Sequence, residues 1–285
     1  MLHNQQSKRV AVIGGIRTPF CRSHSAYKKC TNKDLMSAAL KGLVEKYDLR
    51  NEALGEVALG ALIKHSNDWN LARESVIECG LSMRTPAFDL QRACGTSLEA
   101  AILIANKISL GQIDSGIAGG TDSISDTPVV YPAEYRNLLM EIHCARSPID
   151  RIKSVLKIRP KHFKPQFPGV SEPQTGLSMG ESTELMAKTW NIDRKNQDQL
   201  AFNSHCKAAA AHEAGWFNDL VVPFNGVEKD NNIRSDTTLD KLSMLKPVFD
   251  KSNNGTMTAG NSTPLTDGAA AVLLASEEWA KEKKL

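Results

Sequence analysis

One cysteine, Cys94, stands where its thiol could act as a nucleophile. An extended apolar run at 87–90 ends just before it, and apolar residues then recur at helical spacing over 98–108. The thiol is therefore expected at a helix N-terminus, where unpaired N–H groups and the helix dipole favour the thiolate. Gly95 and Thr96 follow directly and leave room for a carbonyl group to approach. A lone cysteine is more often a buried structural residue than a nucleophile. The rest of the sequence is therefore needed to choose between these two roles for Cys94.

The elements that would position this cysteine alternate between strand and helix. Strands are predicted at 9–14, 56–63, 86–90 and 113–118, and helices at 32–47, 69–78 and 94–110. This alternation predicts an α/β fold with a mostly parallel sheet covered by helices. It stops near Ser125, and a strand pattern resumes at 267–275. The chain between them is predicted to be an insertion between two strands of one sheet.

The predicted insertion contains a basic, proline-rich stretch and then two helices. Residues 151–173 hold four prolines and six lysine or arginine residues, and this density of proline excludes a long helix. A surface loop or flap is expected there. Helices are expected at 180–190 and 194–214, the second with Asp193 as its N-cap and Gly215 at its end.

Composition is that of an ordinary globular protein: 285 residues, 41% hydrophobic, 24% charged, with a formal net charge of +3. That charge does not indicate nucleic-acid binding, and no apolar run approaches the roughly 20 residues of a membrane span. The N-terminus lacks signal- and transit-peptide features, which predicts a cytoplasmic location. The six cysteines show no C-x-x-C spacing and the seven histidines no metal-ligand spacing, so neither a metal site nor a disulfide framework is expected.

Five stretches, in order, resemble motifs of the thiolase family. They are 14–20 (Gly-Gly-Ile-Arg-Thr-Pro-Phe), 91–97 around the cysteine, 119–125 (Gly-Gly-Thr-Asp-Ser-Ile-Ser), 178–180 (Ser-Met-Gly) and 255–270, with Thr-Ala-Gly-Asn and Asp-Gly-Ala-Ala. Asp122, Ile124 and Ser178 depart from the glutamate, methionine and histidine of the family. Each stretch is weak alone, but the ordered set spans nearly the whole chain. Residues 125–128 and 262–267 and the long basic flap resemble the 3-ketoacyl-CoA thiolases of the fatty-acid oxidation trifunctional complex.

Thiolases are built from two similar βαβαβαββ halves, with a loop domain inserted in the first. The resemblance implies the N-terminal thiolase domain at 1–124 and 251–285 and the inserted loop (flap) domain at 125–250. Nothing in the chain resembles the Asn-Glu-Ala-Phe, Gly-His-Pro or Cys-x-Gly motifs of the C-terminal half, which we expect to be absent through truncation. Those motifs supply the water-positioning asparagine, the activating histidine and the second cysteine. The chain alone is therefore expected to be inactive.

The implied activity is that of an acyltransferase of fatty-acid β-oxidation. A 3-ketoacyl-CoA is cleaved reversibly with CoA to acetyl-CoA and a shortened acyl-CoA, with Cys94 as the nucleophile that carries the acyl group. CoA is a co-substrate, and no permanently bound cofactor and no metal are expected. Contacts with CoA or the acyl group are implied for Met179, Arg234, Ala259 and Thr263. Lys241 stands where short-chain members of the family have a serine.

The implied partners are acyl-CoA and CoA, further copies of the full-length chain in a homo-oligomer, and a hydratase/dehydrogenase subunit of a trifunctional complex. The basic stretch 151–164 has three interpretations: a solvated flap face, attraction of CoA phosphates, or docking to an anionic membrane or partner subunit. The prolines argue against an amphipathic membrane helix, so no membrane association is expected.

Other functions remain open. An acetyl-CoA C-acetyltransferase acting on acetoacetyl-CoA is one, and a non-catalytic thiolase-like subunit for acyl-CoA binding or assembly is another. A ketoacyl synthase shares the fold and a cysteine at a helix start, but such enzymes typically lack the long insertion and the Thr-Ala-Gly-Asn segment. A papain-like protease also needs cysteine with histidine and asparagine, but it does not fit the alternating pattern or the late cysteine.

Overall fold

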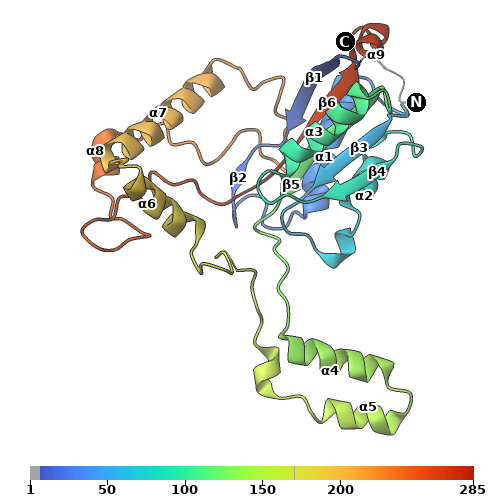
Figure 1. The fold of residues 1–285 in the computed structure, drawn as a ribbon, viewed down its shortest axis with the longest axis vertical. Helices are drawn as coiled ribbons and strands as arrows, with labels where there is room; N and C mark the ends of the chain where they lie inside the picture. The colour runs from blue at the N-terminus through green and yellow to red at the C-terminus, as the bar shows by residue number, and fades with distance from the viewer. Residues whose placement is uncertain (1–6, 170) are drawn as a thin grey trace. The chain divides into compact units, whose positions relative to one another are not determined.

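The computed structural model describes residues 7–169 and 171–285. The chain divides into two compact units: one runs up to Asp126 and again from Met179 to Leu285, and the other covers Thr127–Ser178. A sheet with helices forms the first unit, and a pair of helices dominates the second (Figure 1). The domain boundaries at 125 and 250 remain a prediction.

The first unit is organised around a six-stranded sheet in the order β1-β6-β5-β3-β4, with β2 paired to the start of β6. The strands are β1 (Val10–Arg17), β2 (Cys21–Arg22), β3 (Glu56–Gly60), β4 (Ala87–Leu90), β5 (Ser115–Asp122) and β6 (Thr266–Ser276). β3 runs parallel to β4 and β5, whereas β6 runs antiparallel to β1 and β5. The prediction of a mostly parallel sheet is confirmed for strand direction: among the described strands, β6 alone runs opposite to the others. Hydrophobic periodicity did not reveal this one reversal, because it reports that a strand exists but not its direction.

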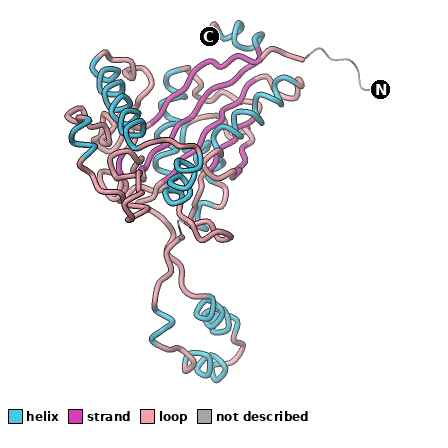
Figure 2. Tube along the Cα trace, turned by 60° about the vertical axis from the view of Figure 1, so that its left-hand side comes forward, coloured by secondary structure: helices cyan, strands magenta, loops and turns pink. Residues whose placement is uncertain are grey.

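Helices cover both faces of this sheet (Figures 1 and 2). Those that pack on it are α1 (Asn32–Lys46), α2 (Leu71–Cys79), α3 (Thr96–Ser109) and α9 (Glu277–Lys283). α1 and α2 share a hydrophobic core with Val57 and Leu273, while α3 forms a second core with Ala58 and Leu274. Adjacent strand residues point to opposite faces, so the two cores lie on opposite sides of the sheet.

Three further helices of this unit come from the predicted insertion: α6 (Met179–Thr189), α7 (Arg194–Glu213) and α8 (Leu239–Ser243). The helices predicted at 180–190 and 194–214 are confirmed to within one residue at each end. Asp193 caps α7 by accepting a hydrogen bond from Asn196 N–H at 2.7 Å. Gly215 follows the helix with φ +74°, in the left-handed region that glycine favours.

The unit Thr127–Ser178 contains α4 (Ala133–Cys144), α5 (Pro148–Val155) and a 3₁₀ turn at Pro160–Phe163. Its small core includes Tyr135, whose ring stacks on His162 with a centroid distance of 5.8 Å. α5 exposes the apolar side chains of Ile149 and Ile152.

Two predictions for this stretch need correction. The described part of 151–173 contains no long helix, as expected, but 151–155 form the C-terminal part of α5 instead of a loop. Pro148 occupies the first turn of α5, where its missing N–H is not needed. The prolines therefore do not exclude an amphipathic helix. Among the described residues, no helix combines the length and apolar character needed to cross a membrane.

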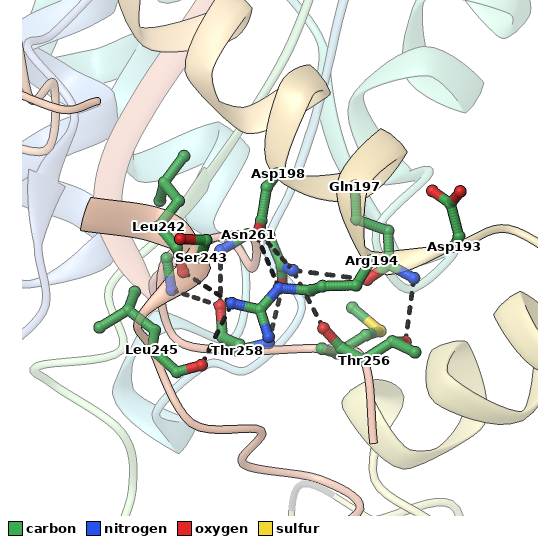
Figure 3. Close-up of polar contacts among 12 residues, drawn as sticks. Asp193, Arg194, Gln197, Asp198, Leu242, Ser243, Leu245, Thr256, Thr258 and Asn261 are labelled. Atoms are coloured by element: carbon green, nitrogen blue, oxygen red, sulfur yellow. Dashed lines mark hydrogen bonds and ion pairs between the residues drawn. The ribbon is translucent and has the colours of Figure 1, made fainter. Parts of the chain in front are cut away.

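Polar contacts hold α7 to its surroundings (Figure 3). Asp198 is the single buried residue of α7. Its carboxylate accepts from Arg194 Nε at 2.7 Å and from Asn261 Nδ2 at 2.9 Å. The Arg194 guanidinium also donates to the carbonyl oxygens of Leu242 at 2.6 Å and Leu245 at 3.1 Å. One buried ion pair therefore joins α7, the end of α8 and the Thr-Ala-Gly-Asn segment.

Glu184 of α6 makes a second buried contact with the same segment. Its side chain accepts from Thr256 N–H at 3.0 Å, the Thr256 hydroxyl at 2.9 Å and Met257 N–H at 2.8 Å. Burial acts to raise the pKa of Glu184, but these hydrogen bonds outweigh it and lower the pKa below its usual value. The carboxylate is thus held in its ionised form.

We expect Glu184→Gln to lower the free energy of unfolding by about 1–2 kcal/mol at neutral pH, because an amide accepts weaker hydrogen bonds than a carboxylate. A group whose pKa is lower in the folded state stabilises the fold above its unfolded pKa, and this contribution is lost as pH falls through the folded value. The difference from the unsubstituted chain should therefore shrink on acidification below about pH 4.3.

Urea unfolding at several pH values measures this difference. The exposed Glu213 on α7 provides the matched control, Glu213→Gln, which should change little. A Glu184→Gln effect that is absent, or that is the same at every pH, would contradict the assigned role.

Candidate active site

Cys94 lies in the turn between β4 and α3, two residues before the helix begins, and its side chain is exposed. Ala93 has φ +45°, which is uncommon for a residue other than glycine. The Thr96 hydroxyl stabilises the turn: it accepts a hydrogen bond from Arg92 N–H at 2.8 Å and donates one to the Ala93 carbonyl oxygen at 2.7 Å. The turn therefore presents the thiol outward at the N-terminus of α3, and the cysteine is not a buried structural one.

The thiol opens into a pocket of about 210 Å³, which we call the Cys94 pocket. It is lined by Phe20, Gly60, Ala93, Cys94, Thr96, Ser97, Gly120, Thr121, Asp122, Thr266, Gly268, Ala269 and Ala270. The ends of β3 and β5 meet the beginning of antiparallel β6 at this edge of the sheet. Strand direction therefore brings together segments that lie far apart in the sequence.

Two glycines let the first turn of α3 approach the sheet. A Cβ atom on Gly60 would lie 2.2 Å from the Leu90 carbonyl oxygen and 2.4 Å from Thr96 Cγ2. A Cβ atom on Gly120 would lie 2.3 Å from Ser97 Oγ. The backbone approach that places the thiol against the strand ends thus depends on residues without side chains.

Asp122 is a second titratable group of the Cys94 pocket, and sequence analysis did not assign it to the site. Its carboxylate accepts from Leu62 N–H at 2.8 Å. Burial raises the pKa of Asp122, although hydrogen bonds from the amides of Leu62 and Ile63 oppose this. The signal in the sequence was its place two residues after Gly119-Gly120, at the end of a predicted strand.

Arg234 and Ala259 line a second, larger pocket of about 560 Å³, the Arg234 pocket. Its other lining residues are Arg22, His205, Asn231, Asn232, Ile233, Ser235, Asp236, Thr237, Lys241, Leu242, Leu245, Gly260, Ser262 and Pro264. The Lys241 ammonium donates to the carbonyl oxygen of Asp236 at 2.6 Å and to its carboxylate at 3.3 Å. The structure therefore brings two of the sequence-predicted contact residues together among several cationic side chains.

The other two predicted contact residues, Met179 and Thr263, are not among the lining residues of either pocket, although Ser262 and Pro264 on either side of Thr263 line the Arg234 pocket. Met179 is the first residue of α6 and its side chain is 61% exposed. Thr263 is also exposed. Their contacts with CoA or an acyl group stay predictions.

Within 7–169 and 171–285, no three or more His, Cys, Asp or Glu side chains are grouped so as to hold a metal ion. None of the histidines in these ranges lines the Cys94 pocket.

Known proteins match this chain over nearly its whole length. The family model described as "Thiolase, N-terminal domain" matches residues 10–278. A 3-ketoacyl-CoA thiolase of Yersinia pestis (strain Pestoides F) is 38% identical over 286 aligned residues, covering 98% of this chain. The chain spans 65% of the length of that relative.

Solved structures give the same result. The Bacillus anthracis acetyl-CoA acetyltransferase superposes with a TM-score of 0.82 at 28% identity, covering 98% of this chain and 68% of its own. Human mitochondrial 3-ketoacyl-CoA thiolase in complex with CoA gives a TM-score of 0.80 at 27% identity, covering 97% and 67%. The resemblance inferred from the five motifs is confirmed. From the match of its sequence and of its fold, the chain belongs to the thiolase family.

Proposed function

We propose that this chain provides the nucleophile and a CoA-binding surface for thiolytic cleavage of 3-ketoacyl-CoA in fatty-acid β-oxidation. The observation that carries the proposal is the exposed thiol of Cys94, placed at the N-terminus of α3 inside a pocket formed by strand ends. The name of the Yersinia relative, 3-ketoacyl-CoA thiolase, supports the same reaction.

In the proposed reaction the Cys94 thiolate attacks the 3-keto carbon of the substrate. The bond between C2 and C3 breaks, acetyl-CoA leaves as its enolate and takes up a proton, and the acyl group remains on sulfur. The thiolate of CoA then attacks this thioester and releases the shortened acyl-CoA, which restores the Cys94 thiolate. The backbone N–H of Cys94 is the proposed oxyanion donor.

The Arg234 pocket is the proposed site for CoA. Arg22, Arg234 and Lys241 supply positive charge for phosphate groups, and the planar guanidinium of an arginine also stacks well on a flat ring. Phe20 lines the Cys94 pocket and Arg22, two residues further along the chain, lines the Arg234 pocket. The proposal is that one long, thin substrate contacts both pockets.

An acetyl-CoA C-acetyltransferase acting on acetoacetyl-CoA is the second candidate, favoured by the similarity to the Bacillus anthracis enzyme. A homo-oligomer of the full-length protein, a hydratase/dehydrogenase partner subunit and a cytoplasmic location complete the proposal. The oligomer and the partner subunit rest on the resemblance to the thiolase family.

Coenzyme A binding tests the Arg234 pocket. We expect Arg234→Ala to weaken CoA binding about tenfold, because a phosphate or adenine contact with a guanidinium is lost. Lys207→Ala removes an exposed positive charge from α7 outside the pocket lining and is the control. Titration calorimetry measures both, and equal affinities for the two variants would overturn the assignment.

Alkylation tests the nucleophile. Iodoacetamide near neutral pH is expected to modify Cys94 at least about threefold faster than Cys144 or Cys206, because its thiol lies at the N-terminus of α3, beside backbone N–H groups that have no partner within the helix. All three thiols are exposed, but Cys144 ends α4 and Cys206 lies inside α7, so they are internal controls. Peptide mapping by mass spectrometry gives the three rates, and uniform labelling would contradict the proposed activation.

Turnover by the 285-residue chain alone is expected to be absent or nearly so, because the resemblance assigns the activating histidine and second cysteine to the C-terminal half of the family. The measurement is acetyl-CoA release from acetoacetyl-CoA and CoA. Cys94→Ser reports any contaminating activity. An enzyme-like rate that disappears in Cys94→Ser would show this expectation to be wrong.

A further inference from the structure

The segment Arg17-Thr18-Pro19-Phe20 begins at the last residue of β1 and takes no part in the chemistry proposed above. Phe20 nevertheless forms one wall of the Cys94 pocket. Its ring lies against the start of β6, where a Cβ atom on Gly268 would come within 2.3 Å of Phe20 Cδ1. The position of this ring therefore determines how much space is available beside the thiol.

The main chain of Phe20 is held by a distant part of the sequence. Its N–H donates to Asp230 Oδ1 at 2.7 Å, and its carbonyl oxygen accepts from Asn231 N–H at 3.3 Å. Both terminal nitrogens of Arg17 donate hydrogen bonds to the same Asp230 carboxylate, at 2.7 and 2.9 Å. The Arg17 guanidinium also lies over the Phe20 ring, 4.7 Å from its centroid.

This ion pair is largely buried. The side chains of Arg17 and Asp230 are 17% and 12% exposed, and His212 Nε2 lies 3.5 Å from the carboxylate. Burial acts to raise the pKa of Asp230, but Arg17 and the Phe20 N–H outweigh it and lower the pKa. Removing one charge of such a pair leaves the other without compensation.

The contacts of Asp230 also reach the second pocket. Asn231, its neighbour, accepts from Arg22 N–H at 2.7 Å, and Arg22, Asn231 and Arg234 all line the Arg234 pocket. Hydrogen bonds of Asp230 and Asn231 therefore connect the segment 230–234, which carries Arg234, to the segment 17–22, which carries Phe20.

We propose that Asp230 is a positioning residue that fixes Phe20 as a wall of the Cys94 pocket and thereby limits the size of the group that can lie beside the thiol. The identification of that group as the acyl chain rests on the proposed function. The claim that Phe20 limits the space beside Cys94 does not rest on the proposed function, because it follows from the contacts of Phe20 alone.

The experiment compares alkylation of Cys94 by iodoacetamide and by the bulkier N-phenyl iodoacetamide. The rate ratio of bulky to small reagent is measured at Cys94 and, in the same molecules, at Cys206. We expect Asp230→Asn and Phe20→Ala each to raise the ratio at Cys94 by at least about threefold and to leave the ratio at Cys206 unchanged. The two substitutions combined should exceed Phe20→Ala alone by little, because both act on one wall.

Asp219→Asn is the matched control: Asp219 is exposed and pairs with Lys46, away from both pockets. Arg17→Lys, which keeps the charge but loses the two-nitrogen grip, gives a second variant if Asp230→Asn folds poorly. It should raise the ratio in the same direction. The proposal is overturned if both variants give the ratio of Asp219→Asn, or if their effects add fully to that of Phe20→Ala.

Failure of this inference and failure of the proposed function give different results. An unchanged ratio with normal CoA binding and preferential alkylation of Cys94 would remove only the role of Asp230. A changed ratio without CoA binding would keep that role and count against the proposed function.

Discussion

The antiparallel insertion of β6 between β1 and β5 is the constraint on which the rest of the structure depends. β6 pairs with both neighbours along most of its length, with Leu274 opposite Val12 on one side and Gly116 on the other. The chain leaves the sheet after β5 and must return to this position. Buried Asp267 marks the return, because its carboxylate accepts hydrogen bonds from the main chain and hydroxyl of Ser125, at the point of departure.

This arrangement also determines what surrounds the thiol. Since β6 runs against β5, its first residues lie beside the last residues of β5, and both contribute walls to the Cys94 pocket. The first turn of α3 closes in from one face because Gly60 and Gly120 have no side chains to prevent it. The site is therefore a consequence of strand direction and close backbone packing.

The helices of the insertion are held differently. α7 buries a single residue, Asp198, so hydrophobic burial contributes little to its position. Charged side chains fix the position of this part of the insertion instead. They are Arg194 with Asp198, Glu184 with the amides at 256 and 257, and Arg17 with Asp230. Buried charges are tolerated only when paired or hydrogen-bonded, and each of these meets that condition.

The sequence by itself predicted most strands and helices of the sheet unit and the place of Cys94 at a helix N-terminus, because these follow from patterns among neighbouring residues. The helical spacing after Cys94, the cap at Asp193 and the glycine at 215 each act within one or two helical turns. Only the tertiary structure decided the direction of β6, the helix α5 at the start of a proline-rich stretch, and which of the predicted contact residues line a pocket. Contacts such as that between Phe20 and Asp230 span more than two hundred residues, and no local pattern specifies which distant carboxylate a backbone amide will meet.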